Sequence, residues 1–173
     1  MAQDRPVPVT EAVVRGAGLH DAPALFHAWQ RLRRHNASID RRFIPAPVNQ
    51  DDFVADLAEL LQRPQSAAFV ADVQGNLAGF ISARVEQNQP DRLPATHVTV
   101  GYLWVEERYR RAGIARTLFA AVADWARTQD GVAHFEMAVL GADTGAAAFW
   151  RSIGFVPFIE RLWAPLSAPE RDA

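Results

Sequence analysis

The order in which strand and helix patterns alternate constrains the fold of this chain more than any other feature. Short apolar runs, rich in β-branched and aromatic residues, separate longer segments whose apolar residues recur at steps of three and four. This alternation predicts the order β-α-α-β-β-β-α-β-α-β. We therefore expect an α/β (mixed α+β) fold in which helices flank a central mixed sheet that is mostly antiparallel.

The clearest single element is the helix expected over residues 113–129, where Ile114, Leu118 and Val122 share one face. The strands are expected at 11–16, 67–73, 77–86, 97–105, 133–140 and 155–163. The other helices are expected to begin at Asp21, at Asn49 or Asp51, and at Asp143, with a loop over 36–47 after the first. Residues 11–164 are predicted to form one domain with flexible ends at 1–10 and 165–173.

Two missing residue types limit the chemistry that the chain can perform. The 173 residues include no cysteine, which excludes disulfides, thiolate metal sites and a cysteine nucleophile. All 18 basic residues are arginine, which excludes a Schiff-base lysine and the lysine of a P-loop. We expect no metal in the site.

Charge and hydropathy predict a cytoplasmic protein without a nucleic-acid or membrane partner. The net charge is −2, so the chain as a whole lacks the basicity that attracts nucleic acids or anionic membranes. No segment approaches a membrane span of about 18 apolar residues, and residues 1–10 lack the apolar core of a signal peptide.

The turn between the strand that ends near Val105 and the helix that begins at Gly113 is the most informative segment for function. Glycine and small residues let a ligand approach the backbone, and a helix N-terminus presents unpaired N–H groups. With Arg110, Arg111 and Arg116 nearby, the turn predicts a site for phosphate or pyrophosphate. The structural alternative is a basic turn with a glycine at the helix start. The sequence contains neither a P-loop nor a dinucleotide-binding glycine motif.

Two motifs carry a resemblance to a known family. The pattern [RQ]-x-x-G-x-[GA] occurs at Arg110, Gly113 and Ala115. Residues 143–155 are similar to the pattern N-x-x-A-x-x-F-Y-x-x-x-G-F. At this separation and in this element order, the motifs resemble the two signatures of the GNAT superfamily of N-acetyltransferases. The resemblance extends from residue 11 to about residue 164 and implies a GNAT-like fold.

The resemblance implies an acetyl-CoA site in a splayed sheet. In this family the strand before the first motif separates from its parallel neighbour, and the pantetheine arm pairs with the exposed backbone. The diphosphate takes the N–H groups that follow, together with an arginine. The implied cofactor-binding residues are Leu103, Trp104, Val105, Arg110, Arg111, Ala112, Gly113, Ile114, Ala115, Arg116, Asp143, Phe149 and Trp150.

Two positions depart from the family pattern. Trp150 stands where the family often has a tyrosine that protonates the leaving thiolate, and an indole N–H is no acid near neutral pH. Asp143 stands where asparagine is usual; it can still cap the helix but brings negative charge near the cofactor. The missing tyrosine favours an alternative function, an acyl-CoA-binding sensor or partner module with little turnover.

The implied reaction is direct transfer of an acetyl group to a primary amine in a ternary complex. The absence of cysteine excludes an acyl-cysteine intermediate. We predict His97 as the general base, since an imidazole with a pKa of about 6.5 suits this task. Glu86 is a second candidate base, and Tyr109 is a candidate acid. The structural alternatives are a hydrogen-bonded histidine, an exposed carboxylate and a packed aromatic ring.

Strand alternation also predicts which residues face the reacting groups. His97, Thr99, Gly101 and Leu103 are expected on one face of the strand. Tyr102 is expected on the opposite face, in the core.

The acceptor is predicted to be a small-molecule or peptide amine, bound near the first two helices. That region contains His27, Arg31, Arg33, Arg34, His35, Asp40, Arg41 and Arg42. This cluster is either a site for an acidic acceptor or a solvated helix end with an arginine-rich loop. An RNA surface is disfavoured because only Phe43 interleaves the charges. A homodimer is an expectation from the family alone.

Overall fold

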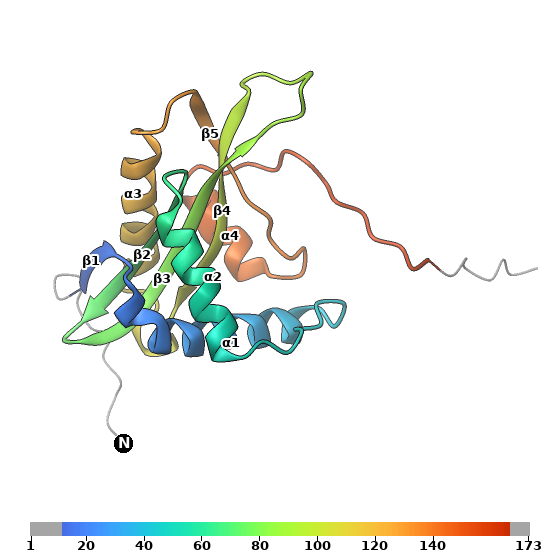
Figure 1. The fold of residues 1–173 in the computed structure, drawn as a ribbon. Coiled ribbons are helices and arrows are strands. Elements are labelled where there is room, and N and C mark those ends of the chain that lie inside the picture. The colour runs from blue at the N-terminus through green and yellow to red at the C-terminus, as the bar shows by residue number, and fades with distance from the viewer. Residues whose placement is uncertain (1–11, 167–173) are drawn as a thin grey trace, which may run out of the picture.

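Five strands form a single sheet within residues 12–166, which the computed structural model describes (Figure 1). They are β1 (Ala12–Gly16), β2 (Ser66–Val73), β3 (Asn76–Gln87), β4 (Thr96–Val105) and β5 (Val132–Glu136). The strands lie in chain order; neighbours from β1 to β4 are antiparallel, and β5 pairs with β4 in parallel. This confirms the predicted mixed, mostly antiparallel sheet.

Four α-helices cover the sheet within the same residues. They are α1 (Ala22–Ile39), α2 (Gln50–Gln62), α3 (Ile114–Ala126) and α4 (Thr144–Ser152), with 3-10 turns η2 (Leu19–Asp21) and η3 (Glu107–Tyr109). The buried residues of α3 and α4 belong to one apolar cluster, which includes Ile81, Val98 and Leu118. Those of α1 and α2 belong to a second cluster, which includes Val70, Phe80 and Trp104. The two clusters therefore occupy opposite faces of the sheet, called here the α3 face and the α1–α2 face.

Local capping explains where two of the helices begin. The side chain of Asn49 accepts a hydrogen bond from the Asp52 N–H at 2.8 Å, and α2 follows. The side chain of Asp143 accepts one from the Ala146 N–H at 2.9 Å, and α4 follows. Both starts agree with the sequence-based expectation.

Helix α1 continues to Ile39 and takes up part of the expected loop over 36–47. Residues 36–39 contain neither glycine nor proline, so nothing in them breaks a helix that already packs on the sheet. The loop therefore begins only after Asp40, whose N–H donates to the Asn36 carbonyl.

The expected strand over 155–163 is wrong. Phe155 packs against Phe119 and Trp150, but the residues after it have no strand partner and stay exposed. Aromatic and β-branched residues favour a strand only where a neighbouring backbone accepts the hydrogen bonds, and Pro157 removes one donor. The preceding strand, β5, also ends at Glu136 rather than at the expected residue 140.

The chain ends that we expect to be flexible fall mainly outside the described residues. Residues 1–10 lie outside them, as do 167–173 of the expected tail 165–173. None of the described helices combines the length and the apolar character needed to cross a bilayer.

An ion pair joins the end of β1 to the start of α1. The Arg15 guanidinium donates to both carboxylate oxygens of Asp21, at 2.7 and 2.8 Å, and Asp21 also accepts from the Gly18 N–H at 2.9 Å. The Arg15 hydrogen bond lowers the pKa of Asp21, outweighing the opposing effect of its partial burial.

Replacement of this carboxylate should therefore destabilise the protein in a pH-dependent way. Because the pKa of Asp21 is lower in the folded than in the unfolded protein, its carboxylate stabilises the fold at pH values above the unfolded pKa of about 3.9. This stabilisation is lost as the pH falls through the pKa of the folded protein. We expect Asp21→Asn to lower the free energy of unfolding by about 1–2 kcal/mol at neutral pH. The difference from wild type should shrink as the pH of urea denaturation is lowered from about 5 to about 2.

Asp124→Asn is the matched control, because Asp124 pairs with Arg127 on the exposed surface of α3 with its side chain 77% exposed. It should change the free energy of unfolding by less than about 0.5 kcal/mol. A difference for Asp21→Asn that does not vary with pH would contradict the ion-pair explanation.

Candidate active site

Strands β4 and β5 run together for only part of their length. Their paired residues end at Thr99 and Glu136, while β4 continues to Val105. No backbone hydrogen bond joins residues 137–143 to β4 in the described part of the chain. Residues 100–105 of β4 thus keep an uncovered edge facing residues 137–143, and we call this gap the splay. Apart from the Val105 carbonyl, which accepts a hydrogen bond from Arg110, the backbone groups along this edge are available to a bound molecule.

A β-bulge at Gly101 changes which side chains face each side of the sheet. Val100 pairs with Ala83 and Tyr102 with Ser82, so Gly101 has no partner on β3. Val100 packs in the cluster on the α3 face, whereas Trp104, an even-numbered residue like it, packs in the cluster on the α1–α2 face.

This inversion corrects the predicted alternation beyond residue 99. His97 and Thr99 share the α1–α2 face with Tyr102 and Trp104, while Leu103 packs against the α3 face. Tyr102 is 46% exposed rather than part of the core. A single extra residue in a strand reverses every later side chain, and the sequence pattern gives no sign of it.

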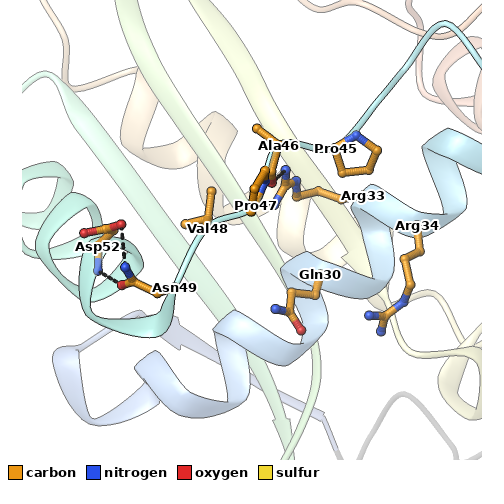
Figure 2. A pocket seen from close by; sticks show the side chains of 9 residues that line it. All are labelled: Gln30, Arg33, Arg34, Pro45, Ala46, Pro47, Val48, Asn49 and Asp52. Carbon is orange, nitrogen blue, oxygen red and sulfur yellow. Dashed lines mark hydrogen bonds between the residues drawn. The ribbon is translucent and has the colours of Figure 1, made fainter.

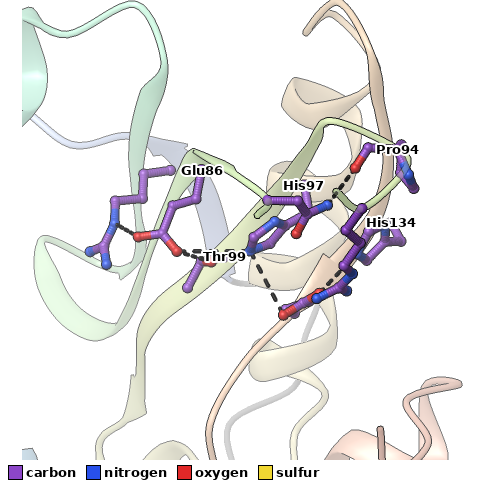
Figure 3. A network of polar contacts seen from close by, with 9 residues as sticks. Glu86, Pro94, His97, Thr99 and His134 are labelled. Atoms are coloured by element: carbon purple, nitrogen blue, oxygen red, sulfur yellow. Dashed lines mark hydrogen bonds and ion pairs between the residues drawn. The ribbon is translucent and has the colours of Figure 1, made fainter. Parts of the chain in front are cut away.

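His97 is buried among polar side chains from three strands (Figure 3). Its Nε2 lies 3.1 Å from the Thr99 hydroxyl and 3.8 Å from carboxylate oxygens of both Glu86 and Glu136. Its Nδ1 has no hydrogen-bond partner in the described part of the chain. Thr99 also donates to Glu86 at 2.7 Å, so one hydroxyl connects the imidazole with a carboxylate. The two candidate bases predicted from the sequence therefore lie in one network.

The two carboxylates beside His97 are held in their ionised form. Partial burial of Glu86 opposes ionisation, but hydrogen bonds from Thr99 and Arg84 outweigh it and lower its pKa. The His134 hydrogen bond lowers the pKa of Glu136, with a further contribution from Arg92. A carboxylate with a lowered pKa binds a proton weakly at neutral pH. Glu86 is therefore the weaker candidate for the base, and the role of His97 stays a prediction.

The same region contains the residues best placed to hold a metal ion. Ligand atoms of His97, His134 and Glu136 lie within 4.8 Å of one another. The two imidazole rings, however, are stacked, with centroids 5.5 Å apart and planes 14° from parallel. A histidine binds a metal through a lone pair in its own ring plane, and Glu136 already accepts a hydrogen bond from Arg92. The arrangement therefore favours a hydrogen-bonded network, and the absence of a metal stays a prediction.

The turn from β4 into α3 presents five consecutive free amides. Arg111 and Gly113 have φ values of 64° and 83°, which turn the backbone sharply before α3. Within the described residues, the N–H groups of 111–115 donate no hydrogen bond, and the first internal donor of the region is the Arg116 N–H. Unpaired amides at a helix N-terminus are typical of anion-binding sites, so the turn remains the candidate site for the diphosphate.

The arginines of this turn have different surroundings. The Arg110 side chain donates to the Val105 carbonyl at 3.0 Å and lies 4.7 Å over the Trp104 ring. Arg116 reaches Ser152 of α4 at 3.5 Å. Arg111 is exposed. Of the three, Arg111 is therefore the least committed to contacts within the chain.

Helix α4 and η3 place the remaining predicted residues. Trp150 is buried in an aromatic cluster with Phe119, Phe149 and Phe155. Tyr109 is buried in the cluster on the α3 face, with Arg108 over its ring. Its role as an acid stays a prediction, as does the role of Phe149 beside the cofactor.

The arginine-rich cluster of α1 does not converge on one point. A cavity of about 490 Å³ lies between α1 and the segment before α2 and is lined in part by Gln30, Arg33 and Arg34. Figure 2 shows these lining side chains. Arg33 also donates to the Ala46 carbonyl and stacks on Trp29. Arg31 pairs instead with Glu106 after β4.

A smaller cavity of about 210 Å³ lies directly at the bulge. Its lining includes Gly101, Ser82 and Arg84, with Asp56 and Glu59 of α2 on the other side. Because Thr99 pairs with Arg84, which lines this cavity, the cavity lies beside the His97–Thr99 network and is the better candidate for the acceptor.

Sequence reasoning missed His134 and Glu136 and placed His35 only within the arginine-rich cluster. His134 and Glu136 are two residues apart in β5, so their side chains lie on the same face of the sheet. The pattern His-x-Glu in an expected strand was the signal that could have found them. His35 contacts Asp143, far away in sequence, and no local pattern predicts that contact.

Comparisons with known proteins agree with this geometry. The profile of the Acetyltransferase (GNAT) family matches residues 27–155. A tetramutant of a Bacillus halodurans protein is 19% identical, with a TM-score of 0.77 over 89% of this chain and 99% of that one. The aminoglycoside N-acetyltransferase AAC(6')-Iy in complex with CoA is 18% identical, with a TM-score of 0.69 over 90% of this chain and 100% of that one.

A third solved structure has the same fold at lower identity. Glucosamine-6-phosphate N-acetyltransferase from Arabidopsis thaliana is 12% identical, with a TM-score of 0.69 over 90% of this chain and 99% of that one. No curated protein matches the sequence. The family profile spans both sequence motifs, the splay and the amide turn, and this chain belongs to the GNAT acetyltransferase family.

Proposed function

We propose that this protein is an acyl-CoA-dependent N-acetyltransferase that moves the acetyl group of acetyl-CoA directly to a primary amine of a small molecule or peptide. The observation that carries the proposal is the splay, whose uncovered β4 edge leads into five free amides at residues 111–115. Membership of the family and the likeness in fold to a CoA-bound acetyltransferase support it.

The two backbone features suit the two halves of CoA. The free amides at 111–115 and the exposed Arg111 suit the diphosphate, since they present donors and positive charge to an anion. The uncovered edge of β4 at Leu103 and Val105 suits the amide groups of the pantetheine arm, which would pair as a strand does. The reacting thioester then lies near the bulge at Gly101, where free N–H groups of β4 can stabilise the developing oxyanion.

The acceptor amine approaches from the α1–α2 face, through the cavity at Gly101. In this step the Thr99 hydroxyl turns from Glu86 towards His97 Nε2, 3.1 Å away. Its oxygen takes the amine proton as its own proton passes to that nitrogen. The carboxylates of Glu86 and Glu136 stabilise the imidazolium that forms. The amine nitrogen bonds to the acetyl carbon, the carbon–sulfur bond breaks, and the electron pair leaves with sulfur.

A second candidate function is an acyl-CoA sensor with little turnover. Trp150 favours it, because the indole is buried among aromatic rings where the family often has a tyrosine acid. Release of free thiol from acetyl-CoA across a panel of amines distinguishes the two functions. CoA binding without thiol release across the panel would favour the sensor.

Gly113→Asp should weaken CoA binding while leaving the fold intact. The substitution places a carboxylate at the centre of the five free amides, where the diphosphate would bind. We expect the Kd for CoA, measured by calorimetry, to rise by about tenfold or more. Circular dichroism checks that the fold is retained.

Gly75→Asp is a matched control for this substitution. Gly75 has φ 79°, close to the 83° of Gly113, and lies in the β2–β3 turn with open space around its Cα. The two variants carry the same added charge and a similar backbone strain, but only one lies at the amide turn. Equal CoA affinities for both variants would refute the placement of the diphosphate.

His97→Gln should lower kcat/KM by about 100-fold at neutral pH, because the variant cannot take the amine proton. Thr99→Val should cause a similar loss, since it removes the hydroxyl that connects His97 with the acceptor side. His20→Gln, at a side chain 73% exposed in η2, is the control and should retain full activity. A wild-type pH–rate profile in His97→Gln would remove this residue from the mechanism.

A further inference from the structure

His35 connects the two sides of the splay. Its Nε2 lies 3.4 Å from a carboxylate oxygen of Asp143, which begins α4. Its ring lies 5.9 Å from the ring of Trp104 near the end of β4. One imidazole, contributed by α1, thus touches both the strand that keeps the free edge and the helix start that faces it. A molecule lying along that edge of β4 passes beside His35.

The reaction leaves a thiolate that needs a proton. Trp150 cannot supply one near neutral pH. Tyr109 lies in the cluster on the α3 face, on the other side of the sheet from α1. His35 contacts both walls of the splay, and an imidazole can donate a proton through a ring nitrogen.

We propose that His35 is the general acid of the reaction and protonates the CoA thiolate. This inference rests on the proposed acetyl transfer. As the carbon–sulfur bond breaks, the electron pair goes to sulfur, and sulfur takes the proton of the imidazolium Nε2. The neutral imidazole then regains a proton from solvent before the next turnover. Asp143 acts as a positioning residue that holds the imidazolium at the splay.

The identity of residue 143 fits this role. One oxygen of Asp143 accepts the Ala146 N–H and caps α4, while the other lies beside His35. A carboxylate has one oxygen to cap the helix and a second to contact His35, and its negative charge stabilises the imidazolium. An asparagine has only one side-chain oxygen and no charge. The departure from the family's usual residue and the missing tyrosine acid are thus explained by a single contact.

The other charges near His35 are paired or held by neighbours. Arg110 lies over the Trp104 ring and donates to the Val105 carbonyl. Arg31, one turn earlier on α1, pairs with Glu106. Among the residues that the structure describes, Asp143 is therefore the charged side chain in direct contact with the His35 imidazole.

The first test compares His35→Gln with His20→Gln, a control in η2 whose side chain is 73% exposed and lies outside the proposed site. Thiol release is measured at saturating acetyl-CoA and amine. We expect kcat of His35→Gln to fall by about 100-fold and to lose its dependence on pH on the alkaline side. CoA affinity should stay within about threefold of wild type, an energy difference under about 0.7 kcal/mol. Equal kcat values for the two variants would overturn the proposal.

The second test changes the leaving group. In an acetyl-CoA analogue with selenium in place of sulfur, the leaving selenolate is a weaker base and departs without an acid. With this donor, the kcat of His35→Gln should be nearly equal to that of the wild-type protein. A deficit of the same size with both donors would show that His35 serves binding or structure, and would overturn the acid role.

Asp143→Asn separates charge from helix capping. The variant keeps an oxygen for the Ala146 N–H but loses the carboxylate beside His35. We expect the alkaline limb of its pH–rate profile to move to lower pH, because the imidazolium loses its counter-charge. An unmoved limb with retained activity would contradict the positioning role of Asp143.

A third readout does not require turnover. The imidazole NMR signals of the five histidines are recorded with and without CoA, and the His35 signal is assigned by its absence in His35→Gln. The His35 signal should move on CoA addition and the signal of the exposed His20 should not. An unmoved His35 signal in CoA-bound protein overturns the acid role alone. A wild-type protein that binds no CoA overturns the proposed function and this inference together.

Discussion

The separation of β4 from β5 is the constraint on which the candidate site depends. Backbone donors and acceptors on a strand edge must be paired or exposed, and β4 runs past the last paired residues with one edge uncovered. It stays in place because Trp104 packs into one apolar cluster while Leu103 and Val105 pack against the other. Packing on both faces holds the strand, so its edge remains available for a ligand.

The bulge at Gly101 divides the chemistry between the two faces. Before it, Val98 and Val100 pack on the α3 face; after it, Trp104 packs on the α1–α2 face. The proposed base, the acceptor cavity and the proposed acid are therefore gathered on the side of α1 and α2. The amide turn proposed for the diphosphate lies at the start of α3, so in the proposed reaction the cofactor and the acceptor would reach the splay by different routes.

Polar contacts between distant segments complete the site. His97 lies between carboxylates of β3 and β5, and His35 joins α1 to the start of α4. Each contact joins residues that are adjacent only because the sheet and helices place them so. In the proposed reaction, the first group takes the amine proton and the second returns a proton to sulfur, so acid and base are contributed by different elements of the fold.

The sequence by itself determined the element order as far as α4 and the starts of α2 and α4, and it pointed to the turn at Gly113 as a candidate anion site. These depend on local chemistry: hydrophobic spacing, a capping side chain and unpaired amides at a helix start. Only the tertiary structure decided that residues 155–163 form no strand, that Gly101 reverses the faces of β4, and that His35 meets Asp143. Strand pairing, bulges and contacts between helices depend on partners far along the chain, whose positions no local pattern specifies.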